Sequence, residues 1–294
     1  MSDIIYLFLY KFFKFVATYA PQSLQSPFFT ALAYIFYKFD KKHTNIMRVN
    51  LKMCFPEFTG QKIEKIIKAT YRNFGYFGAD FLRNQDSTKE NILNKVSFKN
   101  EDILLDALDT KRPIIVQTAH YGNWELFSLA MAAKFGSVSI VGRNLDSSVM
   151  DQILSKNRTK FDIELIPKDG GARDILKALK NRRLLGILVD QNTAKKDGVQ
   201  CEFFGKKIMH TPAASIFANK TGAIIIPAFI KRISRDKNEI CFFKEILAEN
   251  YEGDKLQKAT QAQSDATEQM IKEKPDEYFW MHKKFKHFYE EIYK

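Results

Sequence analysis

From about residue 95 to residue 246, short apolar runs rich in Ile and Val alternate with longer stretches of helical periodicity. Short runs bounded by turn residues predict buried strands, and strands that alternate with helices are typical of an α/β sheet with right-handed crossovers. The expected strands are Pro113–Thr118, Val138–Val141, Glu164–Pro167, Leu184–Val189, Ala223–Ile230 and Glu239–Ile246. The expected helices are Trp124–Lys134, Ser147–Phe161, Ala172–Asn181 and Pro212–Lys220, then two closing helices at 255–273 and 276–292 on either side of Pro275.

The first 42 residues are crowded with aromatic side chains, in "IIYLFLYKFFKFVATYA" (4–20) and "PFFTALAYIFYKFDKK" (27–42). Lys11 and Lys14 share one helical face, which suits a helix lying in a membrane interface or a tilted span whose lysines snorkel. Two core helices are the alternative, but aromatic residues cover nearly every face rather than one stripe. There is no basic region followed by a small-x-small cleavage site, so a removable signal peptide is not expected.

Helical periodicity continues through residues 61–83, and no internal repeat or low-complexity linker follows it. We therefore expect three parts. Residues 1–42 form hydrophobic membrane-anchoring helices, residues 43–94 form a helical segment packed on the sheet, and residues 95–294 form the α/β domain. If the first helix spans a membrane, the acidic "MSD" before it and the lysines after it place the rest of the chain in the cytoplasm.

The chain is basic, with 46 Lys and Arg against 34 Asp and Glu and a formal net charge of +12. Such a charge favours anionic partners, but no nucleic-acid reading element or stacking platform is recognisable, so nucleic acid is not expected. Cys54, Cys201 and Cys241 are far apart and form no CxxC pair, which argues against a disulfide framework. No cluster supplies three metal ligands, and no metal is expected.

One of only five histidines, His120, lies in "TAHYGNWELF" (118–127), directly after an expected strand. Functional groups gather beyond the carboxyl ends of the strands in α/β sheets. Asn123 is a plausible N-cap of the following helix, with Gly122 allowing the turn. Residues five apart on a straight helix are about 140° out of phase. His120 and Glu125 therefore meet only if His120 precedes the helix and folds back over its first turn.

In that geometry Glu125 accepts a hydrogen bond from one ring nitrogen of His120, and the other nitrogen is free to take a proton. The two residues would correspond to the base and the orienting carboxylate of a catalytic triad. No nucleophile of the protein is recognisable, because no Ser lies in a GxSxG elbow and no Cys is near. The nucleophile is then a hydroxyl of the substrate. The alternative is structural: a Glu in the first turn complements the helix dipole, and a histidine at a strand end acts as a cap.

"HYGNWE" has the form H-x4-E and resembles the motif of the late acyltransferases of lipid A biosynthesis, relatives of the H-x4-D glycerolipid acyltransferases. The resemblance extends over essentially the whole chain. Further similar stretches occur in the family's order: "RVNLKMCFPE" (48–57), "VGRNLD" (141–146), "LVDQN" (188–192), "TPAASIFANKTGAIIIPAF" (211–229) and "PDEYFWMHKKFK" (275–286). The segments "GRNLDS" and "HKKFK" depart from the usual family forms, which bears on acceptor specificity. The fold implied is glycerolipid-acyltransferase-like, with a mixed central sheet flanked by helices.

The resemblance implies transfer of a fatty acyl group from acyl carrier protein to a hydroxyl of a lipid A precursor. His120 would be the general base and Glu125 its partner. Arg143 would bind phosphate or stabilise the thioester oxyanion, unless it is an ordinary loop arginine. Asp190 and Gln191 follow the strand 184–189 and are assigned to substrate positioning with Asn123; a capping or turn role is the alternative.

The expected partners are acyl carrier protein, a phosphorylated lipid A precursor and the bacterial inner membrane, with the catalytic domain facing the cytoplasm. The acyl carrier protein thioester is a co-substrate, and no cofactor is expected. Two other functions stay open: O-acylation of a lysophospholipid or another glycolipid, and non-enzymatic binding of lipid phosphates at a membrane. The basic residues considered for the anionic surfaces are Arg158, Lys160, Arg173, Arg182, Arg183, Lys283, Lys284 and Lys286.

Overall fold

The structure is a computed structural model, and it describes residues 3–143 and 145–294. Its centre is a seven-stranded sheet in the order β1-β9-β8-β2-β5-β3-β4. All neighbouring strands are parallel except β8 and β9, which are antiparallel, so the sheet is mixed, as expected. The strands are β1 (Val96–Lys99), β2 (Ile114–Thr118), β3 (Val138–Gly142), β4 (Ile163–Pro167), β5 (Leu184–Leu188), β8 (Ile224–Arg232) and β9 (Asn238–Phe242).

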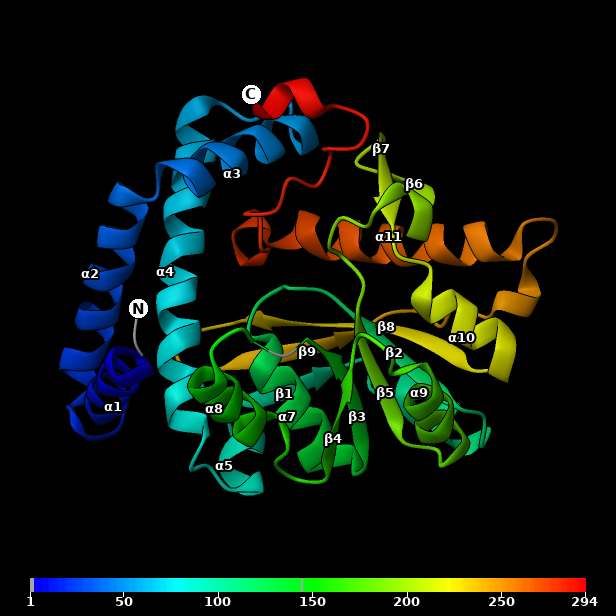
Figure 1. Cartoon of the computed structure of the whole chain (residues 1–294), viewed down its shortest axis with the longest axis horizontal. Helices are drawn as coiled ribbons and strands as arrows, with labels where there is room; N and C mark the ends of the chain where they lie inside the picture. Colours follow the sequence, from blue (N-terminus) through cyan, green and yellow to red (C-terminus); the bar gives the residue numbers. More distant parts are fainter. Residues whose placement is uncertain (1–2, 144) are drawn as a thin grey trace.

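The central strands carry continuous apolar runs because helices cover both faces of the sheet, as Figure 1 shows. All six strands predicted from the sequence are present. Strand β1 and the hairpin of β6 (Val199–Phe203) and β7 (Lys206–His210) were not predicted. They are short and partly exposed, and their apolar runs are weak. The helices of this part are α5 (Lys89–Leu93), α6 (Asp102–Asp109), α7 (Trp124–Phe135), α8 (Ser148–Arg158), α9 (Ala172–Lys180), α10 (Ala213–Thr221) and α11 (Lys255–Glu273).

The predicted helix at 276–292 is wrong. Short 3-10 turns occur at Pro275–Glu277 and Glu290–Tyr293, and the chain between them is irregular. Its aromatic and basic side chains satisfy separate tertiary contacts: Trp280 is 1% exposed and Phe285 is fully buried, although they lie on no common helical stripe. Tertiary packing here overrides local helical propensity.

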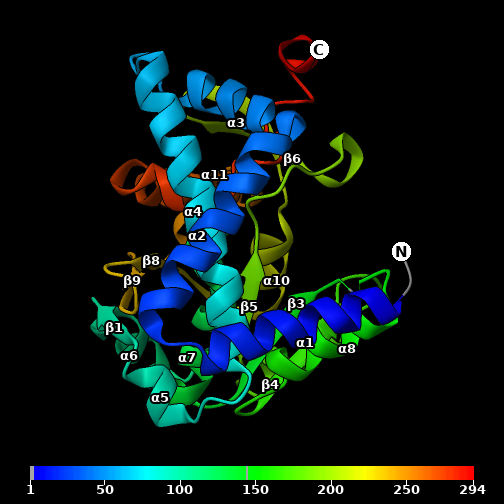
Figure 2. The same ribbon diagram turned by 90° about the vertical axis from the view of Figure 1, so that its left-hand side faces the viewer.

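The N-terminal part is helical, as expected, and consists of α1 (Asp3–Tyr19), α2 (Gln22–Phe39), α3 (Lys41–Cys54) and α4 (Gly60–Asn84). Helix α4 stands along one end of the sheet, and α2 packs along its outer side (Figures 1 and 2). Helix α1 crosses the C-terminal end of α4 and lies beside α8 (Figure 2). Among the described residues, no helix combines the length and apolarity needed to cross a membrane.

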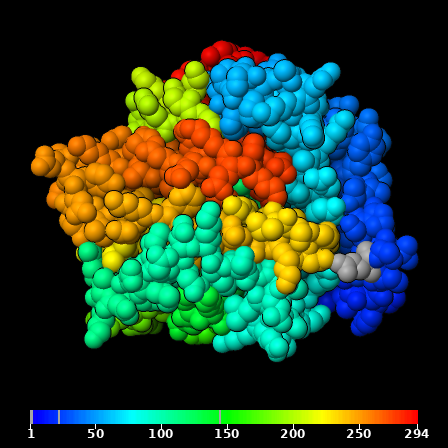
Figure 3. Space-filling view, turned by 180° about the vertical axis from the view of Figure 1, so that it is seen from behind, coloured from blue at the N-terminus to red at the C-terminus, as the bar shows by residue number. Residues whose placement is uncertain are grey.

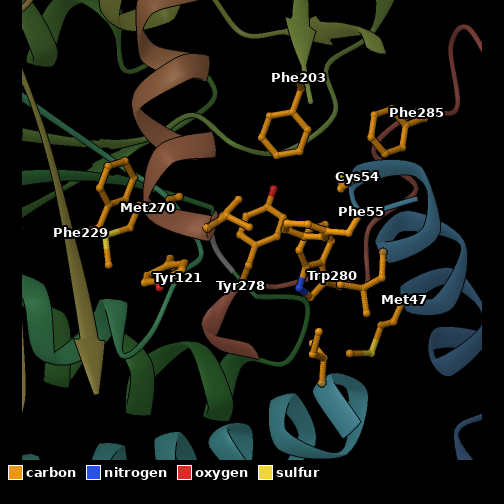
Figure 4. Packing of buried hydrophobic residues seen from close by; sticks show 14 of the residues in the cluster. Met47, Cys54, Phe55, Tyr121, Phe203, Phe229, Met270, Tyr278, Trp280 and Phe285 are labelled. Carbon is orange, nitrogen blue, oxygen red and sulfur yellow. The ribbon is translucent and has the colours of Figure 1, made fainter. Parts of the chain in front are cut away.

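The C-terminal helix α11 lies across the back of the molecule, above the segment around α6 (Figure 3). A cluster of buried aromatic and aliphatic residues joins α3, α4, α11, the β6–β7 hairpin and the irregular C-terminal segment. In Figure 4, Tyr278 lies between Tyr121 on one side and Trp280 on the other. This cluster fixes the C-terminal segment against the loop that follows β2.

Candidate active site

His120 lies two residues beyond β2, in the turn that leads into α7. Asn123 caps α7, because its side-chain oxygen accepts a hydrogen bond from the backbone N–H of Leu126 at 3.0 Å. Gly122 has φ +59°, and a Cβ there would lie 1.9 Å from the carbonyl oxygen of Ile230. The turn therefore needs glycine at this position, and the predicted departure of His120 from the helix is confirmed.

The ring of His120 is held by Asp190, which follows β5. One carboxylate oxygen of Asp190, Oδ1, accepts hydrogen bonds from His120 Nδ1 at 2.9 Å and from the His120 backbone N–H at 3.0 Å. The parallel register explains the meeting: Thr118 pairs with Leu188, and His120 and Asp190 are each two residues further on. The carboxylate thereby fixes the ring and its tautomer.

Asp190 is 2% exposed. Burial alone would raise the pKa of its carboxyl, but the charge and hydrogen bonds of His120, together with the Lys284 ammonium, outweigh it and hold the pKa well below its usual range. Asp190 is therefore ionised at neutral pH, and as an acceptor it requires a proton on His120 Nδ1.

Glu125 is engaged elsewhere, which corrects the expected His120–Glu125 hydrogen bond. Its carboxylate accepts from Arg158, with Nη2 2.5 Å from Oε1 and Nε 3.1 Å from Oε2. Glu125 is 4% exposed. Asp190 occupies the Nδ1 side of His120 from the adjacent strand, while the first turn of α7 directs Glu125 toward the end of α8. Local spacing within one helix could not reveal either partner.

Gln191 lies between two imidazoles. Its side-chain nitrogen is 3.3 Å from Nε2 of His120 and 2.9 Å from Nε2 of His282. Burial is the main cause that lowers the pKa of His282 below its ordinary value. The expected proximity of Asp190 and Gln191 to His120 is thus present, and His282 joins them.

The irregular segment 277–285 forms one wall of the site. Its backbone binds the turn after β2: Phe279 N–H donates to His120 O at 2.9 Å, and Gly122 N–H donates to Glu277 O at 2.9 Å. Lys284, which is 3% exposed, donates from Nζ to the carbonyl oxygen of Asp190. His282 and Lys284 were not predicted from the sequence as site residues. The available signal was a histidine within an aromatic-rich stretch directly after Pro275.

An apolar cavity of about 500 Å³ opens between α1, α2 and α4. It adjoins the site through Phe74, whose ring centroid is 5.3 Å from that of Phe279; the Phe279 ring in turn lies 6.0 Å from the His120 ring. Met281, next to His282, also lines it. The remaining lining residues are mostly aromatic or aliphatic: Tyr6, Leu9, Tyr10, Phe13, Phe29, Leu32, Ala33, Phe36, Asp40, Tyr71, Gly75, Gly78, Phe81, Leu82 and Met150.

A histidine whose Nδ1 is held by a carboxylate, beside an apolar cavity, is compatible with acyl chemistry, and similarity to known proteins decides the family. The model of the bacterial lipid A biosynthesis acyltransferases matches residues 1–287. The chain belongs to this family. The resemblance noted in the sequence is thereby confirmed, and the chain is an acyltransferase of the lipid A acyltransferase family.

Relatives of this acyltransferase act on more than one lipid class. It is 22% identical over 249 residues to the lipid A biosynthesis palmitoleoyltransferase of Escherichia coli (strain K12), covering 84% of this chain and 80% of that one. It is 20% identical over 253 residues to the lipid A biosynthesis lauroyltransferase of the same organism, covering 85% and 81%. It is 21% identical over 168 residues to the phosphatidylinositol mannoside acyltransferase of Mycolicibacterium smegmatis, covering 56% and 55%. Among solved structures, the 1-acyl-sn-glycerophosphate acyltransferase PlsC of Thermotoga maritima aligns over 86% of this chain and 97% of its own, with 12% identity and a TM-score of 0.40.

Two expected substrate-binding residues of this acyltransferase have other contacts in the structure. Arg143 follows β3 with its side chain 76% exposed, and Nη2 is 3.6 Å from Asp146 Oδ1. Asn123 is 2% exposed, and its side-chain oxygen caps α7. Their positions favour a loop role and a capping role over direct contact with substrate.

Two of the basic residues considered for anionic surfaces are turned inward. Arg158 binds Glu125, and Lys284 is buried against Asp190. Lys160 donates to three backbone carbonyls, those of Asn84, Gln85 and Ser87, and so ties the end of α8 to the end of α4.

Proposed function

We propose that the protein transfers a fatty acyl chain from the thioester of acyl carrier protein to a hydroxyl of a lipid A precursor. The observation that carries this is His120, whose Nδ1 is held by ionised Asp190 at 2.9 Å and whose Nε2 contacts only the side chain of Gln191 among the hydrogen-bonding groups of the described residues, next to an apolar cavity in a member of this family.

In the proposed reaction, His120 Nε2 takes the proton of the acceptor hydroxyl as its oxygen attacks the thioester carbonyl. The tetrahedral intermediate collapses, the carbon–sulfur bond breaks, and the proton on Nε2 passes to the thiolate that leaves. Asp190 keeps the ring oriented and stabilises the imidazolium formed in between. Catalysis in this proposal rests on His120 with Asp190 as its partner, while Glu125 binds Arg158.

The acyl chain is proposed to lie in the cavity between α1, α2 and α4. Each buried methylene contributes about 0.8 kcal/mol. A cavity of limited depth would therefore discriminate between chain lengths, because a chain that is too short leaves part of the cavity empty and one that is too long extends beyond it.

The protein is proposed to act at the cytoplasmic face of the bacterial inner membrane, with residues 1–42 as its anchor. The support is an apolar surface on α1 and α2 whose exposed side chains include Ile4, Phe8, Phe12, Phe15, Tyr19, Leu24, Ile35, Phe36 and Phe39. Exposed apolar surface of this extent marks an interaction site, and a membrane holds both the lipid acceptor and its product.

A second candidate function is acylation of a different phosphorylated glycolipid. It is favoured by the similarity to the mycobacterial phosphatidylinositol mannoside acyltransferase at an identity close to that of the lipid A enzymes. The deciding experiment is mass spectrometry of lipids from cells with and without the protein. Loss of one acyl group from lipid A supports the proposal. Unchanged lipid A with loss of an acyl group from another glycolipid supports the second candidate.

A further inference from the structure

The side-chain amide of Gln191 bridges two histidine rings, and this arrangement carries an inference that rests on the proposed acyl transfer. Its nitrogen lies 3.3 Å from His120 Nε2 and 2.9 Å from His282 Nε2. A primary amide has two N–H donors, which is enough to serve both rings.

The direction of the first hydrogen bond follows from Asp190. An ionised carboxylate accepts only, so Nδ1 of neutral His120 carries the proton and Nε2 has a lone pair. Gln191 must therefore present N–H to His120. With the amide reversed, its oxygen would face that lone pair, and the contact would be repulsive.

The second hydrogen bond fixes this orientation of the amide. His282 accepts the other N–H at Nε2, which requires that its ring be neutral. Burial is the largest cause that lowers the pKa of His282. The charge of Asp190 opposes it, and His120, Lys284 and His43 lower the pKa as burial does, so the neutral form prevails at pH 7.

His282 is itself held rigidly. Asn50 Nδ2 of α3 donates to the carbonyl oxygens of both Trp280 and His282 at 2.7 Å, and the rings of His282 and Phe279 are 4.8 Å apart. The acceptor for the Gln191 amide is thus fixed by an element that takes no part in the proposed proton transfer.

We propose that Gln191 donates a hydrogen bond to the oxyanion of the tetrahedral intermediate and that His282 is the positioning residue that aims its amide. When the acceptor hydroxyl takes the place of Gln191 at His120 Nε2, one N–H of the amide is released next to the reacting atoms. The other N–H stays on His282. A pre-oriented donor at the site of developing charge contributes about 100-fold or more to the rate.

The first test separates this role from binding of the acceptor. Gln191→Ala is assayed for transfer to the lipid acceptor and for hydrolysis of the acyl carrier protein thioester without acceptor. Hydrolysis passes through the same oxyanion, so we expect kcat of both reactions to fall about 100-fold. A fall in transfer alone, with hydrolysis unchanged, overturns the inference.

The second test concerns His282. His282→Gln keeps a hydrogen-bond acceptor near the position of Nε2. We expect this variant to retain activity within about fivefold, because only the orientation of the Gln191 amide becomes less exact. His282→Leu removes the acceptor, and we expect it to lower kcat as Gln191→Ala does, with no further loss in the double variant because the two residues act as a unit. His287→Leu in the same segment is the matched control, since His287 is half-buried and lies outside the site. Full activity of His282→Leu overturns the positioning role.

The pH profile gives a readout that a purely structural role would not change. Two rings must be neutral in the wild type, so log(kcat/KM) should steepen at acid pH from a slope of about 1 to about 2. In His282→Gln one ionisation is gone, and the steeper part should disappear. An identical acid limb in both proteins counts against the inference.

A spectroscopic test does not depend on activity and so distinguishes failure of this inference from failure of the proposed function. In ¹⁵N-histidine-labelled protein at pH 7.5, Nε2 of both His120 and His282 should be unprotonated, and Gln191→Leu should shift both resonances. Protonated Nε2 on His282 overturns the inference. Absence of transfer to every lipid acceptor, with these shifts and thioester hydrolysis intact, would instead refute the proposed acceptor.

Discussion

Asp190 Oδ1 accepts hydrogen bonds from both the ring Nδ1 and the backbone N–H of His120, at 2.9 and 3.0 Å, from the strand next to the one that delivers His120. One oxygen therefore fixes the position of the base and the tautomer of its ring. The pair depends on the alignment of β2 with β5.

Asp190→Asn should lower kcat of acyl transfer by about 10⁴-fold, the magnitude known for this change in an orienting carboxylate beside a catalytic histidine. An amide can donate to Nδ1 and so favour the tautomer in which Nε2 carries the proton and cannot act as a base. Steady-state kinetics at saturating donor measures the effect, and a thermal melt checks folding. Wild-type kcat in a folded Asp190→Asn protein would refute the assignment.

Glu125→Gln should act mainly on stability. It leaves the Arg158 guanidinium, whose side chain is 19% exposed, without its carboxylate partner, and the expected loss is about 3 kcal/mol of unfolding free energy. Chemical denaturation measures it. A cycle with Arg158→Met is the control, since the double variant should be less destabilised than the sum of the two single changes. Additive losses would show that the pair is not coupled.

Lys284 should make the unfolding free energy of the protein depend on pH in the alkaline range. Burial lowers the pKa of Lys284 from 10.5 to about 8 in the folded protein, so between these values the unfolded chain binds more protons than the native one. The unfolding free energy contributed by this group therefore rises with pH across that window, by at most about 1.4 kcal/mol per pH unit.

The measurement for Lys284 compares the wild type with Lys284→Met by urea denaturation from pH 7 to 10.5. The pKa of Asp190, which Lys284 also lowers, lies well below this pH range, so the difference between the two proteins reports mainly on this lysine. We expect the unfolding free energy of the wild type to increase relative to that of Lys284→Met as the pH rises. A constant difference in unfolding free energy between the two proteins across this pH range would contradict a lowered pKa of Lys284.

Gly78→Leu should shift the preferred acyl chain to a shorter one. Gly78 lines the cavity, and a Cβ at this position meets no atom within 4 Å. The leucine side chain can therefore fill part of the cavity proposed for the acyl chain. Each methylene excluded from the cavity should weaken kcat/KM for long chains about fourfold. Competition between carrier proteins loaded with different chains measures this, and Gly78→Ala is the control that gains helix propensity without filling the cavity. An unchanged preference would place the acyl chain elsewhere.

The combined change Phe8→Asp and Phe36→Asp should reduce binding to anionic lipid vesicles by at least tenfold, because the two exposed rings, 68% and 59% accessible, would otherwise be buried in lipid. Co-sedimentation measures binding. Leu105→Asp on α6, where the side chain is 44% exposed, is the matched control and should bind as the wild type does. Equal binding by all three proteins would refute a role for α1 and α2 in membrane contact.

Much of the fold was predictable because its signals are local. Short apolar runs and period-3.6 patterns each lie within one element, so the central strands were located within a few residues of their ends, and α11 was predicted at its observed bounds, Lys255–Glu273. The irregular segment after Pro275 was mistaken for a helix, because its residues are buried by contacts with α3, the β6–β7 hairpin and the turn after β2 rather than by a helical stripe.

The amino-acid sequence by itself determined that His120 lies in a turn between a strand and a helix, since only residues 118–127 and elementary helix geometry are involved. Tertiary structure alone decided which groups touch the ring. Asp190 is 70 residues away and Phe279 is 159 residues away in the chain, and strand register and the path of the C-terminal segment bring both to His120. Pairing between distant segments depends on how whole elements pack, and no local pattern near His120 encodes it.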